Sequence, residues 1–363
     1  MTATLVETLH MVPGDGDTSY ARNSTIQGGQ QSNLKPMIEE AVVSLLNDND
    51  GATGLAIADL GCSSGPNTLV LVSTAVAAVR RRCSELRRQP PELCVHLNDL
   101  PNNDFNLVTK SLATYAKAQE SLGPPVLTSI VPGSFHARLF SKRSLHLVCS
   151  NASLQWLSKA PEELVQNGIP FYDRDESARR ARRPAVIQAY ARQFRSDFTQ
   201  ILRLRAQEMV PGGKMVFSLL GQRPDDKPEN ALQLFEFINA VLHEMASKGL
   251  IDEERLHSFY IPVYGPSEKE LREIVEAEGS FSIDKMAIHE PPPSRNANLT
   301  PKARAGGLRA AMEPIIVRHF GASPPAMDEF LRIAEKLIKM SHVEDEYPNK
   351  PRAFVAASLT RRA

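Results

Sequence analysis

The sequence of 363 residues predicts an α/β fold, in which a doubly wound sheet of about seven strands carries an α-helical cap. Short apolar runs, typical of strands that are covered on both faces, alternate with segments of helical periodicity. The first of these runs stops abruptly at an acid, two glycines and small polar residues, as a strand that leads into a ligand-binding turn does. The chain also carries more helices than the two faces of a sheet need, and the surplus is expected to form the cap.

The first strand is expected over residues 55–58, and the turn after it, residues 59–65, has the pattern D-x-G-x-x-x-G. Gly61 and Gly65 let the backbone turn where a bulky ligand must approach closely. The turn lacks the G-x-G-x-x-G spacing and the Lys-Ser/Thr of phosphate-binding loops, so it favours a cofactor without a pyrophosphate. A helix follows, because residues 67–68 can cap a run with apolar residues at helical spacing.

The second strand is expected over residues 94–98 and is followed by Asp99. In nucleoside-binding doubly wound domains, an acid at this point accepts hydrogen bonds from ribose hydroxyls. Asp99 is therefore the candidate for that role.

Two further strands, residues 126–131 and 145–149, break into small polar residues at their carboxyl ends. The carboxyl ends of parallel strands meet at one edge of a sheet, so the loops after the first four strands should line one crevice. Trp156, the only tryptophan of the chain, follows the fourth strand. A lone tryptophan is more often a core residue, but here its ring and N–H are expected near the crevice.

The same periodicities predict the remaining elements, and the Pro-Gly-Gly of residues 211–213 should end a helix before the fifth strand. The arginine-rich segment 174–183 has no periodicity, so we expect an exposed, mobile loop there. The helices are expected over residues 34–46, 186–209, 229–248, 268–277, 304–320 and 327–340, and the strands over residues 214–220, 281–288 and 353–359.

These elements divide the chain into two discontinuous parts. The cap should cover the crevice and enclose an apolar chamber for a second small molecule. The core is expected to comprise residues 1–156, 196–221, 276–294 and 346–363, and the helical cap residues 157–195, 222–275 and 295–345.

Composition narrows the class of partner. Lys and Arg number 42, as do Asp and Glu, so charge predicts neither a nucleic-acid nor an anionic-membrane partner. Without an apolar run near the length of a membrane span or a signal pattern, we expect a soluble, cytoplasmic protein. The four cysteines show no C-x-x-C pairing, which favours reduced thiols over a zinc site or disulfides.

Five separated motifs, in order along the chain, closely resemble those of the plant SABATH methyltransferases. These enzymes make methyl esters of salicylic, benzoic, jasmonic, indoleacetic and related acids, or N-methylate xanthines. The resemblance implies a Rossmann-like methyltransferase sheet, S-adenosylmethionine as cofactor and a small carboxylic acid as partner. We also expect a homodimer. The motifs are residues 9–27, 58–67, 97–101, 131–135 and 154–158.

The resemblance also implies the site residues. Gln27 and Trp156 would be the catalytic pair that holds the substrate carboxylate, while Asp59 would face the methionine end of the cofactor, Asp99 the ribose and Phe135 the adenine. The implied cofactor contacts are Tyr20, Ser24, Asp59, Asn67, Asp99, Leu100, Ser134 and Phe135. The substrate pocket would further be lined by Ala152, Gln155, Leu234, Phe235, Tyr264, Leu308, Ala311 and Phe354.

The sequence departs from the family pattern in three places. Many of its carboxyl methyltransferases have an aromatic residue at the position of Ala152 and Met or His at that of Gln155, so the pocket floor should be smaller and more polar here. Val12 replaces a lysine that is common in the N-terminal motif. Residues 257–260, where some members bind magnesium, lack the acidic and amide ligands of a hard cation, which argues against a metal site.

The sequence therefore predicts an S-adenosylmethionine-dependent O-methyltransferase that converts the carboxyl group of a small plant acid, benzenoid or hormone-like, to its methyl ester. One alternative is an N-methyltransferase of a purine or another small nitrogen compound. The other is a catalytically silent cofactor-binding paralogue, which the changes at Ala152 and Gln155 allow.

Overall fold

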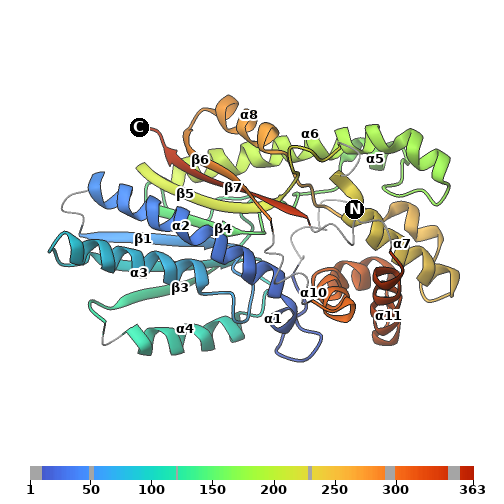
Figure 1. The fold of residues 1–363 in the computed structure, drawn as a ribbon, viewed down its shortest axis with the longest axis horizontal. Coiled ribbons are helices and arrows are strands. Elements are labelled where there is room, and N and C mark those ends of the chain that lie inside the picture. Colours follow the sequence, from blue (N-terminus) through green and yellow to red (C-terminus); the bar gives the residue numbers. More distant parts are fainter. Residues whose placement is uncertain (1–9, 49–52, 120–121, 228–230, 291–298, 342–351) are drawn as a thin grey trace.

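The computed structural model describes residues 10–48, 53–119, 122–227, 231–290, 299–341 and 352–363 (Figure 1). Seven strands form one sheet in the order β3-β2-β1-β4-β5-β7-β6. Neighbours from β3 to β5 pair in parallel, and β7 pairs antiparallel with both β5 and β6. The strands are β1 Gly54–Leu60, β2 Glu92–Asp99, β3 Val126–Pro132, β4 Leu145–Asn151, β5 Met209–Gly221, β6 Phe281–His289 and β7 Ala353–Arg361. The predicted fold class is confirmed.

The strand order places the crevice. From β1 the chain adds β2 and then β3 on one side, and it returns to add β4 on the other side of β1. In open α/β sheets, ligands bind at the carboxyl ends of the strands where the order reverses in this way. The expected crevice therefore lies beyond the ends of β1 and β4, and Asp99 is the last residue of the neighbouring strand β2.

Alternation along the strands builds a hydrophobic core on each face of the sheet. In β1, Leu55 and Ile57 belong to the core under helices α2, α3 and α4, whereas Ala58 and Leu60 belong to the core shared with α6, α7 and α8. The helices are α1 Tyr20–Asn23, α2 Thr25–Asp48, α3 Val70–Glu85, α4 Phe105–Gln119, α5 Glu162–Gln166, α6 Glu176–Glu208, α7 Gln233–Ser247, α8 Glu268–Glu278, α10 Pro301–Phe320 and α11 Pro324–Met340, with a 3-10 turn at Glu254–Ser258.

Three helices form the cap expected from the surplus of amphipathic segments. Helices α7, α10 and α11 lie together beyond one end of the strands (Figure 1), where α11 packs against both α7 and α10. Thr300 and Ser323 cap α10 and α11, since each side chain accepts a hydrogen bond from the backbone N–H three residues later. Proline begins each of these two helices, as its fixed φ favours.

Segment 174–183 is not the loop that the sequence suggested. Asp175 accepts a hydrogen bond from the Ala178 backbone N–H and starts α6 at Glu176. The arginines of this first part lie on a solvated helical surface and pair with acids, for example Arg180 with Glu176 in the same helix. A helix that buries no apolar stripe at its start shows no hydrophobic periodicity there, so the prediction of a loop was wrong.

Other helix boundaries also differ from the prediction. Helices α10 and α11 begin three residues earlier than expected, at Pro301 and Pro324. Helix α2 begins at Thr25 and not near residue 34, because its first turns present polar side chains to a cavity in place of an apolar stripe. Helix α6 ends at Glu208, and Pro211–Gly213 lies inside β5, so these residues do not separate helix from strand. Leu9 of the first motif and Glu229 of an expected helix fall outside the described residues. No helix in the described part of the chain is both long and apolar enough to cross a membrane.

Candidate active site

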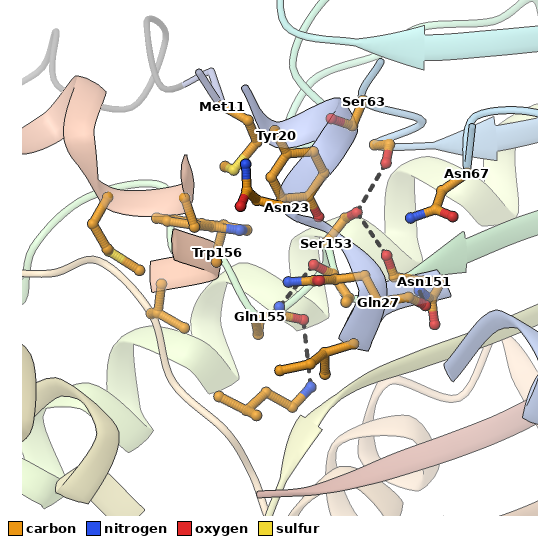
Figure 2. A pocket seen from close by; sticks show the side chains of 18 of the residues that line it. Met11, Tyr20, Asn23, Gln27, Ser63, Asn67, Asn151, Ser153, Gln155 and Trp156 are labelled. Carbon is orange, nitrogen blue, oxygen red and sulfur yellow. Dashed lines mark hydrogen bonds between the residues drawn. The ribbon is translucent and has the colours of Figure 1, made fainter. Parts of the chain in front are cut away.

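A cavity of about 670 Å³ lies at the carboxyl edge of the sheet, under the cap. Its walls come from residues 10–31, from the loops after β1 to β4, from the ends of β5 and β7, and from α7 and α10 (Figure 2). The structure therefore brings the four strand-end loops to one crevice, as the sequence predicted.

Most of the expected cofactor residues line this cavity, and two do not. Ser24 is buried behind the wall, where its carbonyl and hydroxyl oxygens accept hydrogen bonds from Asn67 Nδ2 at 3.0 and 2.8 Å. Asp59 lies inside β1 with 2% of its surface exposed. The expected residues on the wall are Tyr20, Asn67, Asp99, Leu100, Ser134 and Phe135.

The two acids form an electrostatically unfavourable pair, in which Asp59 is buried and Asp99, on the cavity wall, is half-buried. Burial, and then the charge of Asp99, raises the pKa of Asp59 to about 8, and its Oδ1 has no hydrogen-bond partner. Burial also raises the pKa of Asp99 to about 6, although Asp99 accepts hydrogen bonds from the Ser63 and Leu100 backbone N–H groups at 2.6 and 2.7 Å. A cationic ligand beside these carboxylates would relieve both their desolvation and their repulsion.

The glycines of the first turn are needed for contacts within the protein. Gly61 has φ +78°, and a Cβ built there would lie 2.3 Å from Ser153 Oγ. Gly65 has φ +101°, and its Cβ would lie 2.6 Å from the Ala21 Cβ. The sequence predicted that a ligand approaches both glycines closely. Gly61 does line the cavity, beside the loop after β4, whereas Gly65 packs against helix α1 and does not lie on the wall.

The residues expected to bind substrate gather on the cap side of the same cavity. Gln27 lies in the first turn of α2 and Trp156 in the loop after β4, about 130 positions apart along the chain. Figure 2 shows both at the cavity, with the nitrogen-bearing edge of the Trp156 indole turned toward its interior. The other expected residues on the wall are Ala152, Gln155, Leu234, Phe235, Leu308, Ala311 and Phe354.

Tyr264 does not line the cavity. Trp156 and Val263 form an isolated antiparallel bridge, and Val263 faces the cavity, so the next side chain points to the opposite side. Tyr264 is 2% exposed, and its hydroxyl donates a hydrogen bond to Glu270 Oε1 at 2.9 Å.

The polar floor expected at Gln155 is occupied by bonds within the protein. Gln155 Nε2 donates to the Ala152 carbonyl at 2.7 Å, and Oε1 accepts from the Leu220 backbone N–H at 3.4 Å. Ala152 has φ +53°, a left-handed conformation that alanine adopts at a cost. Gln155 thus ties the strained loop to the end of β5, and its amide groups are committed to the backbone.

Several wall residues escaped the sequence analysis. Helical spacing from Leu308 and Ala311 would have indicated Met312, one position further along α10. His136 directly follows Phe135 and Asn151 directly precedes Ala152, but neither carried a signal of its own. The wall residues that the sequence did not single out are His10, Met11, Arg22, Asn23, Thr25, Ile26, Gln31, Cys62, Ser63, Asn103, His136, Asn151, Ser153, Leu220, Val263, Leu299, Ala303, Arg304, Gly307, Met312 and Arg352.

Comparison with known proteins shows which family the chain belongs to. Residues 6–362 match the model of a family described as SAM dependent carboxyl methyltransferase. The chain belongs to this family. The resemblance to the SABATH methyltransferases is therefore confirmed over nearly the whole chain, and the protein is a member of the S-adenosylmethionine-dependent carboxyl methyltransferase family.

The alignments with individual relatives span most of the chain. It is 38% identical to jasmonate O-methyltransferase of Arabidopsis thaliana, over 98% of this chain and 99% of that protein. It is 39% identical to caffeine synthase 3 of Camellia sinensis, over 87% of each. Among solved structures, a loganic acid methyltransferase with SAH matches with a TM-score of 0.84 at 32% identity, over 97% of this chain and 99% of that one.

The site fits the cofactor of the family. S-Adenosylmethionine carries a sulfonium and an ammonium group. The carboxylates of Asp59, which is buried and has an unpartnered oxygen, and of Asp99, which is half-buried on the wall, are suited to a cation. Within the described ranges, no three His, Cys, Asp or Glu side chains are grouped so that they could hold a metal ion.

Proposed function

We propose that this carboxyl methyltransferase transfers the methyl group of S-adenosylmethionine to a carboxylate oxygen of a small plant acid, benzenoid or hormone-like, and releases the methyl ester. The observation that carries the proposal is the meeting of Gln27 and Trp156 at one cavity (Figure 2). They offer two neutral N–H donors, which match the two oxygens of a carboxylate. Most of the remaining wall toward the cap is apolar, which suits a substrate with a single charged group.

We assign the cofactor contacts by position on the wall. Asp99 would accept hydrogen bonds from the ribose, and Phe135 would lie against the adenine. The remaining cofactor contacts on the wall would be Tyr20, Asn67, Leu100 and Ser134. Asp59 would act on the methionine end from behind the wall, and Ser24 would act by holding Asn67.

The residues would accelerate the reaction by placement. The bound cofactor supplies a methyl group that is already activated by the sulfonium, and a carboxylate is already ionised at neutral pH, so no general base is needed. Gln27 and Trp156 would each donate to one carboxylate oxygen and aim a free lone pair at the methyl carbon. The apolar wall would exclude water while opposite charges cancel in the transition state.

The shape and polarity of the substrate side favour an acid with a compact apolar body. Leu234, Phe235 and Leu308 from the cap and Phe354 from β7 face the cavity. Two of the relatives described above are named for jasmonate and loganic acid, which supports a carboxylic acid as the substrate.

N-methylation of a purine is the second candidate, and the 39% identity to a caffeine synthase is the observation that favours it. A purine presents several polar edges and needs a matching set of side-chain donors and acceptors. On the floor of this cavity, Gln155 has committed its amide to Ala152 and Leu220. That commitment favours a carboxylic acid.

A substrate screen tests the proposal. The purified chain is incubated with methyl-labelled cofactor and, separately, with benzoic, salicylic, anthranilic, jasmonic, indoleacetic, gibberellic and farnesoic acids and with xanthines. Labelled ester from at least one acid, formed much more slowly by Trp156→Phe, is the expected result. Label on xanthines alone would establish the second candidate, and cofactor binding without any labelled product would indicate the catalytically silent paralogue.

The expected homodimer, the cytoplasmic location and the division into core and cap belong to the same proposal. The relatives described above are named as enzymes of small molecules, which supports a soluble catalyst without a nucleic-acid or membrane partner. Light scattering on the purified chain tests the dimer.

A further inference from the structure

We propose that His136 is a positioning residue, which fixes the backbone of Trp156 against the loop after β3 that carries Ser134 and Phe135. The inference rests on the proposed function, because it takes Trp156 to hold the substrate carboxylate. It adds a link between the two halves of the site, since one loop serves the cofactor and the other the substrate.

The loop after β3 starts from a fixed point. The Gly133 backbone N–H donates to the Asp99 carbonyl at 2.9 Å. Asn98 Nδ2 donates to the carbonyls of Val131 and Gly133 at 2.8 and 2.9 Å. The first residues of the loop are thereby joined to the end of β2, which also carries Asp99.

A buried ion pair then holds the loop on both sides of His136. The side chains of Arg205 and Glu208, in the last turn of α6, are fully buried and lie in contact. Arg205 donates to the carbonyls of Phe135 and Ala137, at 3.1 and 2.9 Å. Glu208 accepts from two backbone N–H groups further along the loop, at 2.7 and 3.2 Å. An ion pair buried in this way is stable only in a fixed geometry, so the backbone on both sides of His136 is held rigidly.

From this rigid backbone, His136 reaches the substrate loop. Its Nε2 lies 3.1 Å from the Trp156 carbonyl oxygen. A carbonyl can only accept, so Nε2 carries the hydrogen. Burial lowers the pKa of His136, while the charge of Asp197 opposes this and that of Arg205 adds to it. The neutral ring with its hydrogen on Nε2 is therefore the form that makes the bond at neutral pH.

The other contacts of the Trp156 backbone join it to other segments than the loop after β3. The Trp156 backbone N–H donates to the Ser153 carbonyl, and the bridge to Val263 holds it from the cap side. Two residues later, Ser158 is tied to Asp197 of α6 through its N–H and hydroxyl, at 2.8 and 2.7 Å. Among the described contacts of the Trp156 backbone, the hydrogen bond from His136 is the one that joins it to the loop after β3. Loss of that hydrogen bond would misalign the carboxylate, and a misplacement of about 1 Å can cost on the order of a hundredfold in rate.

Three variants separate positioning from a merely structural role. His136→Phe keeps a ring and removes the donor, whereas His136→Gln can place an amide N–H near the position of Nε2. His146→Phe is the matched control, because His146 Nδ1 accepts a hydrogen bond from the Ala56 backbone N–H at 3.1 Å inside the sheet and does not line the cavity.

Kinetics and binding are measured on all three. We expect His136→Phe to lower kcat/KM for the acid about tenfold, with the Kd for S-adenosylhomocysteine within about twofold of the unmodified protein, and we expect His136→Gln to recover most of the loss. His146→Phe should lower the Tm alone. Unchanged kcat/KM in His136→Phe, or a loss that follows the Tm in both Phe variants, would overturn the inference.

A second readout needs no substrate. Trp156 is the only tryptophan, so fluorescence excited at wavelengths that tyrosine does not absorb reports on it alone. In the S-adenosylhomocysteine complex, the anisotropy decay should show a larger fast component in His136→Phe than in His136→Gln or His146→Phe. Equal decays in all variants would refute the role of His136. If no acid is methylated, the proposed function fails, and this measurement still decides whether His136 holds Trp156.

Discussion

At the scale of single residues, the proposed site combines two neutral donors for the substrate with two carboxylates for the cofactor, of which Asp59 is buried and Asp99 half-buried. Gln27 and Trp156 line the same cavity, while Asp59 and Asp99 lie close enough for the charge of Asp99 to raise the pKa of Asp59. Orientation of the acid and attraction of the cationic cofactor are therefore assigned to different side chains.

The donor pair predicts a specific mutational pattern. Trp156→Phe keeps most of the packing and removes only the N–H, so kcat/KM should fall by roughly one to two orders of magnitude, the worth of a hydrogen bond to a charged group, while the Tm changes little. Gln27→Ala should lower kcat/KM by a similar factor. The double variant should lose less kcat/KM than the product of the two single losses. In each single variant, the one remaining donor already fails to fix the orientation of the acid. Full activity in a destabilised Trp156→Phe protein would make Trp156 a core residue.

The acid pair predicts how cofactor affinity depends on pH. Asp59 and Asp99 hold protons up to about pH 8 and 6 without cofactor, and a cation favours their ionised forms. Binding of S-adenosylmethionine should therefore release protons, and its affinity should rise from pH 5 to pH 9. Calorimetry in buffers of different ionisation enthalpy measures the release, which Asp59→Asn should reduce. A pH-independent affinity would contradict the assignment.

The same shifts fix the sign of the stability change without cofactor. An unfolded aspartate loses its proton near pH 3.9, whereas the folded protein retains these protons to higher pH. The folded state thus binds more protons between about pH 4 and 8, and the free energy of unfolding should fall as the pH rises through that window. Thermal melts of the unmodified protein and of Asp59→Asn measure this contribution.

At the scale of elements, the site depends on close approach between segments that are distant in the sequence. Gly65 allows helix α1 to pack on the turn after β1, and Asn67 of that turn is bonded to Ser24 at the start of α2. The N-terminal residues Tyr20 and Gln27 reach the cavity through these contacts. The glycine turn therefore acts on the cofactor side through the position of the N-terminal helices.

This arrangement predicts the effect of a single methyl group. Gly65→Ala should displace α1, since the new Cβ would lie 2.6 Å from the Ala21 Cβ, and both stability and cofactor affinity should fall by about 1 to 3 kcal/mol. Gly212→Ala is the control: Gly212 has φ +78° but nothing within 4 Å of an added Cβ. It should cost about 1 kcal/mol of stability and leave the affinity unchanged. Equal losses of affinity in both would show that α1 is not involved.

At the scale of the whole molecule, sheet and cap enclose the cavity from opposite sides. Strand-end loops supply the wall beside Asp99, and helices α7 and α10 supply Phe235 and Leu308. Since ligand binding joins these parts, it should stabilise the folded chain as a unit.

Cofactor product therefore provides a test that spans the molecule. S-Adenosylhomocysteine at a hundred times its Kd should add about 2.7 kcal/mol to the free energy of unfolding and raise the Tm by several degrees. Differential scanning fluorimetry measures the shift, and Asp99→Ala should show a smaller one at the same concentration. No shift in the unmodified protein would refute the cofactor site.

Much of this architecture follows from local patterns. Short apolar runs indicated the strands, including β1 and β4, because burial on both faces demands continuous apolar sequence. The start of α6 was missed since Asp175 and the arginines after it bury no stripe, and the start of α2 was missed since its polar turns serve the cavity. Sequence patterns report burial, so helices that bury little or line a polar site escape them.

By itself, the sequence determined the α/β class, the order of the motifs, the family, and the set of polar residues at the ends of the strands. These properties depend on periodicity and on residue type. Tertiary structure alone decided which side chains meet: it placed Asp59, Ser24 and Tyr264 behind the wall, committed Gln155 to the backbone, and brought His136 to Trp156. The reason is that hydrogen-bond partners far apart in the chain are selected by the packing of strands and helices, and neither spacing nor composition records that packing.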